Sequence, residues 1–382
     1  MTGPFRNHLP VKIRFGEGVL SDLPGILADE GCSRPFVVVD EFVQTLPSVA
    51  AVLGRIGGAT LYPKSAGEPT VDDVEDAAAK LGASGADAVV AIGGGSVMDT
   101  AKAARLVSSQ GGPYLRFPAG GVAYELPEIP LVAIPTTAGT GSEVSGGAVI
   151  TNEATNTKAG IANPLLRAQH ALVDPELTYG LPPGPTAHSG IDALAQALAA
   201  VVVKVRTPIG NAIGLEGTRL AAEALPTAVA DGSDRAARAQ MACASLMGGL
   251  AMNISDCGSE HSIAQAIGGQ LHIPHGLTIG LVLAETMDHD RKAVPELFER
   301  IADALGEPDD GSGDGSRAVR GVRRILKEID FPTLRSVGVT EEHLDGLAEA
   351  ALEDYFISVA PAPWSKDDVV VAYRAALAID AR

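Results

Sequence analysis

The sequence predicts two domains, an α/β domain followed by a domain made only of helices. In the first half, short β-rich runs alternate with stretches of helical composition, which is typical of a mainly parallel sheet covered on both faces. After about Pro185, strand-like runs become scarce and long alanine-rich stretches dominate. We place the boundary after Gly184, which gives domains of residues 1–184 and 185–382.

The elements expected in the first half follow one another in strand–helix order. The predicted strands are short runs rich in β-branched and apolar residues, at 11–15, 35–39, 88–92 and 131–134. The predicted helices lie between these runs, at 19–30, 43–56, 71–82 and 99–107. In folds of this class, ligands bind beyond the carboxyl ends of the strands.

The second half has a different texture. Its predicted helices are long and alanine-rich, at 190–203, 211–225, 235–253 and 261–267. The proline-rich segment 181–186 cannot continue a helix, so it marks the junction, with Thr186 as the expected cap of the next helix. Segment 309–316, rich in Asp and Gly, is expected to be a solvated loop between helices.

Composition narrows the class of protein. The 382 residues are 46% hydrophobic and carry a formal net charge of -18, so a globular chain that avoids nucleic acid and anionic membranes is expected. Three cysteines without paired spacing indicate a reducing cytoplasm. No run is long enough to span a membrane, and residues 1–6 do not read as a signal peptide.

The most informative stretch joins a predicted strand to a predicted helix through glycines. The apolar run 88–92 suits a strand buried on both faces, and Gly93, Gly94, Gly95 and Ser96 are expected to form the turn after it. Such a turn points free N–H groups and a helix N-terminus at one spot, which suits a phosphate or pyrophosphate. Glycines let a ligand approach the backbone closely. A plain turn without a ligand is the alternative.

Two further loops are expected at the same edge of the sheet. Asp40 follows the run 36–39, and the polar, glycine-rich segment 135–143 follows the run 131–134. Together with the turn at 93–96, these loops outline a cofactor cleft.

A second group of polar residues lies on the predicted helices of the second half. His188, Asp192 and Gln196 are four residues apart, as are His261 and Gln265, so each set can share one helical face. One carboxylate and several imidazoles, with His275 farther on, can converge on a divalent metal. Helix caps and surface groups are the alternative, and His272 is expected to be a loop residue.

These motifs, taken in order, resemble the iron-containing (group III) alcohol dehydrogenases. The resemblance rests on five segments, whose order and spacing match from about Val11 to the C-terminus: Gly93–Lys102, Ile134–Glu143, Asp174–Thr178, Gly190–Leu194 and Pro274–Gly276. It implies the dehydroquinate synthase-like architecture, in which a dinucleotide-binding α/β domain precedes a helical domain and the active site lies between them.

The resemblance also implies a reaction and residues for its cofactor. The reaction is hydride transfer between NAD(H) and a small alcohol or its aldehyde or ketone, here with carbonyl reduction expected. Asp40 would meet the adenosine ribose and repel a 2′-phosphate, which favours NAD over NADP. The other residues implied near the cofactor or the reacting centre are Gly93, Gly94, Gly95, Ser96 and Asp99 at the pyrophosphate loop, Thr136, Thr137 and Thr140 along the cofactor, and Lys158 near the reacting centre.

The chain departs from the family at its metal site. The family pattern of one Asp and three His is met by Asp192, His261 and His275, while Gln196 stands at the third histidine position. Gln265 replaces a further histidine near the substrate, and Ala360–Ala362 replaces the usual Asn-Pro-Arg. An amide oxygen is a weaker metal ligand than an imidazole.

Three arrangements of this site stay open. Fe²⁺ or Zn²⁺ is held by three ligands with Gln196 as a weak fourth, or His188 fills the gap from one turn earlier. Alternatively, as in the maleylacetate reductases, no metal binds and His261, His275, Gln196 and Gln265 polarise the substrate. The lost imidazole favours the arrangement without tightly bound metal.

The same residues bear on other functions and on the assembly. A dehydroquinate synthase-like lyase would need a cluster of Lys and Arg for phosphate, which the sequence lacks. A non-catalytic nucleotide-binding relative is the remaining alternative, since two histidines are lost. In the reducing reaction, His261, His275 or a water chain would supply the proton. A homodimer is expected from family and symmetry.

Overall fold

The computed structural model describes residues 5, 7–118, 125, 127–155 and 157–379. They fall into two compact units. The first is Leu9–Thr178, and the second contains the residues from Tyr179 onward together with the described residues up to His8. The α/β and all-helical fold class is confirmed, and the division at Thr178 lies slightly ahead of the boundary expected after Gly184.

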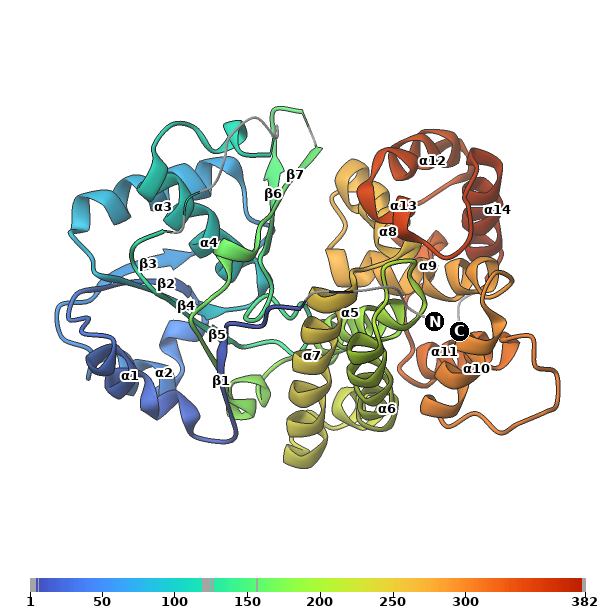
Figure 1. The fold of residues 1–382 in the computed structure, drawn as a ribbon, viewed down its shortest axis with the longest axis horizontal. Coiled ribbons are helices and arrows are strands. Elements are labelled where there is room, and N and C mark those ends of the chain that lie inside the picture. The colour runs from blue at the N-terminus through green and yellow to red at the C-terminus, as the bar shows by residue number, and fades with distance from the viewer. Residues whose placement is uncertain (1–4, 6, 119–124, 126, 156, 380–382) are drawn as a thin grey trace. The chain divides into compact units, whose positions relative to one another are not determined.

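The first unit is built on a six-stranded sheet in which every pair of neighbouring strands is parallel (Figure 1). Its order is β1-β8-β5-β4-β2-β3. The strands are β1 (Lys12–Phe15), β2 (Pro35–Asp40), β3 (Thr60–Lys64), β4 (Ala88–Gly93), β5 (Leu131–Pro135) and β8 (His170–Val173). A separate antiparallel hairpin joins β6 (Gly147–Asn152) to β7 (Thr157–Ala162).

Helices cover both faces of this sheet (Figure 1). Val37 and Val39 of β2 point into one core, with α1 (Leu23–Asp29) and α2 (Pro47–Leu53). Phe36 and Val38 point into the other core, with α3 (Val71–Ser84) and α4 (Gly95–Gln110). Because side chains alternate along a strand, a strand buried on both sides must be apolar over its buried length, as β2 is up to Val39 and β4 is throughout.

Two predicted helices are interrupted by proline. The helix expected at 43–56 is split at Leu46, whose backbone is extended (φ -63°, ψ 134°) immediately before Pro47. A residue that precedes proline is driven out of the helical region, so the new helix starts at Pro47. The helix expected at 19–30 becomes a short 3₁₀ helix followed by α1, with Pro24 in its first turn. Here Leu23, which precedes Pro24, stays helical (φ -51°, ψ -46°), and proline interrupts only the hydrogen bonding, because it has no N–H to donate. The 3₁₀ helices are η1 (Val19–Asp22), η2 (Val43–Thr45), η3 (Tyr114–Arg116), η4 (Pro164–Leu166), η5 (Pro175–Thr178), η6 (Arg335–Val337) and η7 (Glu341–His343).

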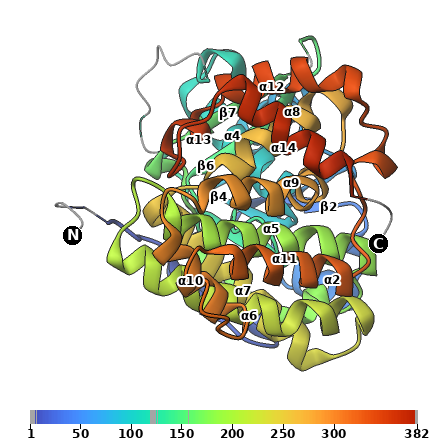
Figure 2. The same ribbon diagram turned by 90° about the vertical axis from the view of Figure 1, so that its right-hand side faces the viewer.

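The second unit contains helices and no strand among its described residues. Figure 2 shows α5 and α9 in its middle, with α12 and α14 above them and α6, α7 and α10 below. The helices are α5 (Pro183–Val202), α6 (Pro208–Ala230), α7 (Arg235–Ser255), α8 (Ser259–Leu271), α9 (His275–Asp290), α10 (Pro295–Ala304), α11 (Ser316–Glu328), α12 (Leu344–Glu353), α13 (Tyr355–Val359) and α14 (Lys366–Leu377). The acidic, glycine-rich segment lies in the loop between α10 and α11, as expected.

Small residues let α6 and α7 approach α5 closely. A Cβ on Gly214 of α6 would lie 2.4 Å from the carbonyl oxygen of Ala197, and one on Gly248 of α7 would lie 2.8 Å from that of Ala193. Such contacts surround α5 with other helices, so Asp192 on this helix is only 1% exposed. The helix already begins at Pro183, with Pro182 as its cap, so the expectation that Thr186 caps it is wrong. Proline needs no N–H partner at that position, which is why it can open the helix.

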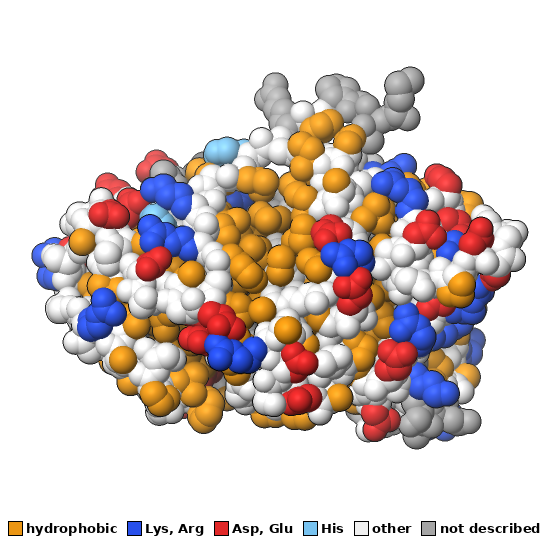
Figure 3. Space-filling model, turned by 90° about the horizontal axis from the view of Figure 1, so that it is seen from below, with side chains coloured by type: hydrophobic (Ala, Val, Ile, Leu, Met, Phe, Trp, Pro, Cys, Tyr) orange, Lys and Arg blue, Asp and Glu red, His pale blue; other side chains and the backbone are white. Residues whose placement is uncertain are grey.

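The surface carries mixed charge. On the face in Figure 3, Lys and Arg side chains lie among Asp and Glu side chains. Ion pairs between exposed side chains of the described residues include Arg219–Glu223 and Arg324–Glu328. Among the described residues, no helix combines the length and the apolar character needed to cross a membrane.

Candidate active site

The carboxyl ends of three neighbouring strands bring together the loops predicted to hold a cofactor. Val39 of β2 pairs with Ile92 of β4, which sets Asp40 beside Gly93. Gly93 in turn pairs with Pro135 of β5, and the backbone N–H of Thr136 donates to the carbonyl oxygen of Gly93 at 3.0 Å. Asp40, the glycine turn and the threonine loop therefore form one continuous row at this edge of the sheet.

The glycine turn is tighter than the sequence suggested. Gly93 ends β4, Gly94 caps α4, and Gly95 and Ser96 already belong to the helix, so the expected turn at 93–96 and helix start near Asp99 are wrong. A Cβ on Gly93 would lie 2.5 Å from Val97 Cγ2, and one on Gly95 would lie 2.7 Å from Thr140 Cγ2. Without side chains, the strand can turn directly into the helix. The first N–H groups of α4, which lack acceptors within the helix, remain at the carboxyl edge of the sheet.

A buried lysine ties the glycine helix to the threonine loop. Lys102 of α4, with no exposed surface, donates to Ser142 Oγ at 2.7 Å and to the carbonyl oxygen of Gly147 at 2.9 Å. Both carboxylate oxygens of Asp99 accept hydrogen bonds, from Ser142 Oγ and from the N–H of Val149. Burial lowers the pKa of Lys102 to about 8, although the nearby Asp99 carboxylate opposes this shift. The sequence showed Lys102 and Asp99 as motif residues but not this network.

The remaining residues expected around the cofactor have defined partners. Asp40 Oδ1 accepts hydrogen bonds from the N–H groups of Phe42 and Val43, at 2.9 and 3.0 Å. Lys158 lies on β7, where its Nζ is 3.1 Å from Glu68 Oε2 and 2.9 Å from Thr151 Oγ1. Thr136 is buried, while Thr137 and Thr140 are half-buried.

The helical unit brings three of the predicted metal ligands together. Asp192 of α5, His261 of α8 and His275 of α9 each offer a ligand atom, and these atoms all lie within 4.8 Å of one another. Oδ1 of Asp192 is 3.5 Å from Nε2 of His261 and 3.7 Å from Nε2 of His275. Asp192 and His261 are buried, while the His275 side chain is 34% exposed. The cluster is therefore open on the side of His275.

The spacing of these atoms fits a divalent metal. Ligands about 2.1 Å from a tetrahedral ion lie about 3.4 Å from one another, close to the distances around Asp192 Oδ1. That oxygen is buried and has no hydrogen-bond partner among the described residues. A buried carboxylate oxygen without a donor is costly, and a cation between it and the two imidazoles would satisfy it.

The electrostatics of the cluster also favour a cation. Burial raises the pKa of Asp192, but the imidazoles of His261 and His275 outweigh burial and leave the pKa below its ordinary value. Burial would lower the pKa of His261, but the neighbouring Cys257, Asp192 and Glu260 side chains together raise the pKa well above its ordinary value. The surroundings of His261 thus stabilise positive charge, which a proton or a metal ion can supply.

The other polar residues predicted near this cluster lie on the same helices. Gln196 is buried one turn after Asp192, and Gln265 is half-buried one turn after His261. His188 packs edge-on against Phe331, with ring centroids 5.7 Å apart, and does not belong to the three-residue cluster that the described residues form. His272 is the exposed residue that ends α8, as expected of a loop residue.

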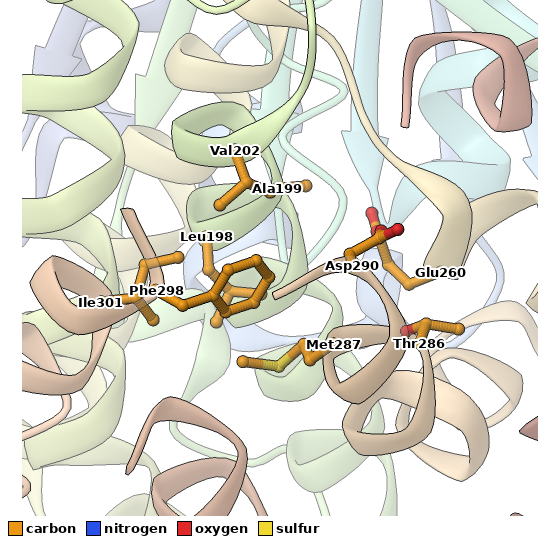
Figure 4. A pocket seen from close by; sticks show the side chains of 9 residues that line it. All are labelled: Leu198, Ala199, Val202, Glu260, Thr286, Met287, Asp290, Phe298 and Ile301. Atoms are coloured by element: carbon orange, nitrogen blue, oxygen red, sulfur yellow. The ribbon is translucent and has the colours of Figure 1, made fainter. Parts of the chain in front are cut away.

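A small pocket behind His261 contains two carboxylates that the sequence did not single out. Figure 4 shows Glu260 and Asp290 together on one side of it, with apolar side chains such as Leu198 and Phe298 on the other. Oδ2 of Asp290 accepts a hydrogen bond from Ser259 Oγ at 2.6 Å. Burial raises the pKa of Asp290 to about 7, against the effect of that hydrogen bond.

The raised pKa of Asp290 predicts a pH-dependent stability. The folded chain holds this proton more tightly than the unfolded chain does, so the contribution is full below about pH 4 and is lost as the pH rises to about 7. Asp290→Asn has no such proton, so its free energy of unfolding should lack the decrease that this proton causes in the wild type between low and neutral pH. We expect that decrease to be about 4 kcal/mol or less, and urea unfolding of both proteins between pH 4.5 and 7.5 measures it. Asp288→Asn, a 41%-exposed neighbour on α9, should leave the profile unchanged.

Comparison with known proteins agrees with both units. Residues 10–175 match the family described as iron-containing alcohol dehydrogenase, and residues 186–377 match the C-terminal domain of the same family. The chain is 35% identical to the probable alcohol dehydrogenase EutG of Escherichia coli, over 94% of this chain and 92% of that protein. It is 34% identical to the NAD-dependent methanol dehydrogenase of Bacillus methanolicus, over 97% and 99% of the two chains. A crystal structure of 1,3-propanediol oxidoreductase superposes with a TM-score of 0.93 at 30% identity, covering 98% and 100%.

The chain belongs to the iron-containing alcohol dehydrogenase family. The predicted family and the prediction of an oxidoreductase enzyme are thereby confirmed. The roles of the individual site residues remain predictions.

Proposed function

We propose that this protein is an NAD(H)-dependent oxidoreductase that interconverts a small alcohol and its aldehyde or ketone, working as a carbonyl reductase. The observation that carries the proposal is the cluster of Asp192, His261 and His275, whose ligand atoms lie within 4.8 Å of one another. The same chain also has a glycine-rich helix N-terminus, where Gly94 caps α4. A chain that only bound nucleotide would have no need for a buried carboxylate beside two imidazoles.

The first unit supplies the groups that suit the nucleotide. The N-terminus of α4 at Gly94, Gly95 and Ser96 presents backbone donors to the pyrophosphate. Asp40, one strand away, suits the ribose hydroxyls, because its carboxylate accepts hydrogen bonds and repels a 2′-phosphate. Thr136, Thr137 and Thr140 line the neighbouring loop. When bound, NADH supplies the hydride.

The second unit supplies the groups that suit the substrate oxygen. Asp192, His261 and His275 would hold a divalent metal, which acts as a Lewis acid on that oxygen when bound. The sequence favoured a site without tight metal, but the spacing around Asp192 Oδ1 supports three ligands with Gln196 nearby. With that metal bound, the His275 Nε2 lone pair is used as a ligand, so a water chain would supply the proton. In a site without metal, His275, the exposed member of the cluster, is placed to pass a proton between the substrate oxygen and solvent.

The test of the proposal is NADH oxidation with a panel of small aldehydes and ketones, followed spectrophotometrically. It is run on protein whose metal content is measured by elemental mass spectrometry before and after a chelator. Turnover that falls with chelation supports the metal-assisted reaction, while turnover retained in metal-free protein supports polarisation by His261, His275 and the two glutamines. No turnover with any carbonyl compound would contradict the proposal.

The nucleotide preference gives a second test. Asp40→Ser removes the negative charge next to the proposed ribose site but keeps a hydrogen-bonding side chain. We expect kcat/KM with NADPH to rise relative to that with NADH by about 10-fold or more, since like-charge repulsion opposes the 2′-phosphate. Asp22→Ser, a 42%-exposed aspartate elsewhere on the unit, is the control and should leave the ratio unchanged. An unchanged ratio in Asp40→Ser would remove Asp40 from the nucleotide site.

The proposal also covers the oligomeric state of the protein and its cellular compartment. We propose a homodimer, which is the commonest assembly of soluble enzymes. Cys32, Cys243 and Cys257 are all free thiols, which supports a reducing cytoplasm. Analytical ultracentrifugation of the purified chain tests the dimer directly.

A further inference from the structure

A buried carboxylate, Glu260, lies directly behind His261. Its Oε1 is 2.8 Å from Nδ1 of His261, and the two side chains are only 7% and 5% exposed. The other ring nitrogen of His261, Nε2, faces Asp192. The two nitrogens of one imidazole therefore face two different carboxylates, one on the metal side and one on the opposite side.

Glu260 is held firmly in this position. The backbone N–H of Gly258 donates to the same Oε1 at 2.9 Å. Glu260 lies in the first turn of α8, where the helix dipole stabilises a negative side chain. Beyond it lies the pocket of Figure 4, which its carboxylate shares with Asp290. Among the described residues, its only ion-pair partner within 4.0 Å is His261.

The contact between Glu260 and His261 determines which ring nitrogen of His261 carries the proton. A neutral imidazole carries one proton, and a carboxylate next to Nδ1 keeps the proton on that nitrogen. The lone pair then remains on Nε2, which is the nitrogen that faces Asp192 Oδ1. A carboxylate on the far side also makes the imidazole a stronger electron-pair donor. Since Gln196 stands where the family has another histidine, the site depends more on each imidazole that remains.

We propose that Glu260 is a positioning residue that fixes the Nδ1-protonated form of His261 and strengthens its Nε2 as a metal ligand. The inference rests on the metal cluster of the proposed function. It concerns binding of the metal rather than the hydride transfer, so the two can be tested separately.

The primary test measures the affinity of Zn²⁺ alone for the full, nucleotide-free chain by competition with a chromophoric chelator. In Glu260→Ala we expect Zn²⁺ to bind about 10- to 100-fold more weakly than in the wild type, as for the loss of similar outer partners. Glu260→Gln keeps the shape and an acceptor oxygen but not the charge, so its loss should be about 3- to 10-fold. If the alanine variant fails to fold, the glutamine variant carries the test.

Asp290→Asn is the matched control, because Asp290 is a buried carboxylate of the same pocket that contacts Ser259 and Trp364. It should bind Zn²⁺ within about twofold of the wild type. A purely structural role for the pocket would weaken Zn²⁺ equally in both positions and would overturn the proposal.

A second readout follows the proton itself. In Zn²⁺-loaded protein labelled with [¹⁵N]histidine, long-range ¹H–¹⁵N spectra should show His261 protonated on Nδ1, with Nε2 bound to the metal. Bonding through Nδ1, or unchanged Zn²⁺ affinity in both Glu260 variants, would overturn the proposal, as would a wild type that binds no Zn²⁺. Reduction of aldehydes by NADH is measured separately and tests the proposed function. If Zn²⁺ binds as predicted but no aldehyde is reduced, the role of Glu260 is supported and the proposed reaction is contradicted.

Discussion

Replacing Asp192 with Asn should lower kcat/KM for carbonyl reduction by more than about 100-fold, which is a loss of about 2.7 kcal/mol of transition-state stabilisation. The substitution keeps the size of the side chain but removes the one negative charge that lies between the Nε2 atoms of His261 and His275. A neutral amide oxygen binds a divalent cation less well, so the metal content of the purified variant should fall as well. Steady-state kinetics and elemental mass spectrometry on the same preparation measure both effects.

Asp354→Asn is the control for this experiment. Asp354 caps α13, and its Oδ1 accepts hydrogen bonds from Ser262 Oγ and from the N–H of Phe356. It is thus a carboxylate next to α8 that is not a member of the three-residue cluster. We expect its kcat/KM to stay within about threefold of the wild type. Full activity and full metal content in Asp192→Asn would show that the cluster is not the reacting centre.

The core of the fold was predictable because burial on both faces leaves a clear signal. Continuous apolar runs at 36–39 and 88–92 are strands β2 and β4, as expected. By contrast, β3 contains Pro63 and Lys64, and β8 contains His170, so neither gives an unbroken apolar run. Their place in the sheet depends on pairing with β2 and β5, from which a helix or a long intervening segment separates them in the sequence. No local pattern contains that information.

The candidate site was predictable in its members more than in its contacts. Asp192, His261 and His275 were expected because one carboxylate and several imidazoles can converge on a metal, and because the resemblance to the iron-containing alcohol dehydrogenases implied this set. The structure brings them together. Glu260 was overlooked, although a Glu directly before a candidate His ligand could have suggested a partner for the ring. Neighbours in a helix ordinarily point in different directions. Glu260 Oε1 nevertheless lies 2.8 Å from Nδ1 of the next residue, in the first turn of α8, and helical spacing does not predict this contact.

Lys102→Met should lower the free energy of unfolding by about 3 kcal/mol, toward the lower end of the range for breaking a buried charged pair. Lys102 is fully buried, and its ammonium group donates to Ser142 Oγ and to the carbonyl oxygen of Gly147. Methionine fills much of the same volume but has no donor, so these acceptors lose their partner. The Asp99 side chain, 17% exposed and 3.9 Å from the ammonium group, would lose its nearby positive charge. Urea unfolding of the variant and the wild type measures the difference.

A double-mutant cycle separates charge from packing in this network. If the main cost is an uncompensated Asp99 carboxylate, Lys102→Met together with Asp99→Asn should be less destabilised than the sum of the two single variants by about 1 kcal/mol or more. Because Asp99 holds Ser142 and Val149, the same variants should also weaken NADH binding through displacement of the threonine loop. Strictly additive single effects, with NADH affinity unchanged, would mean that Lys102 only fills space. In that case the glycine helix and the threonine loop are held together by other contacts, such as Gly95 against Thr140.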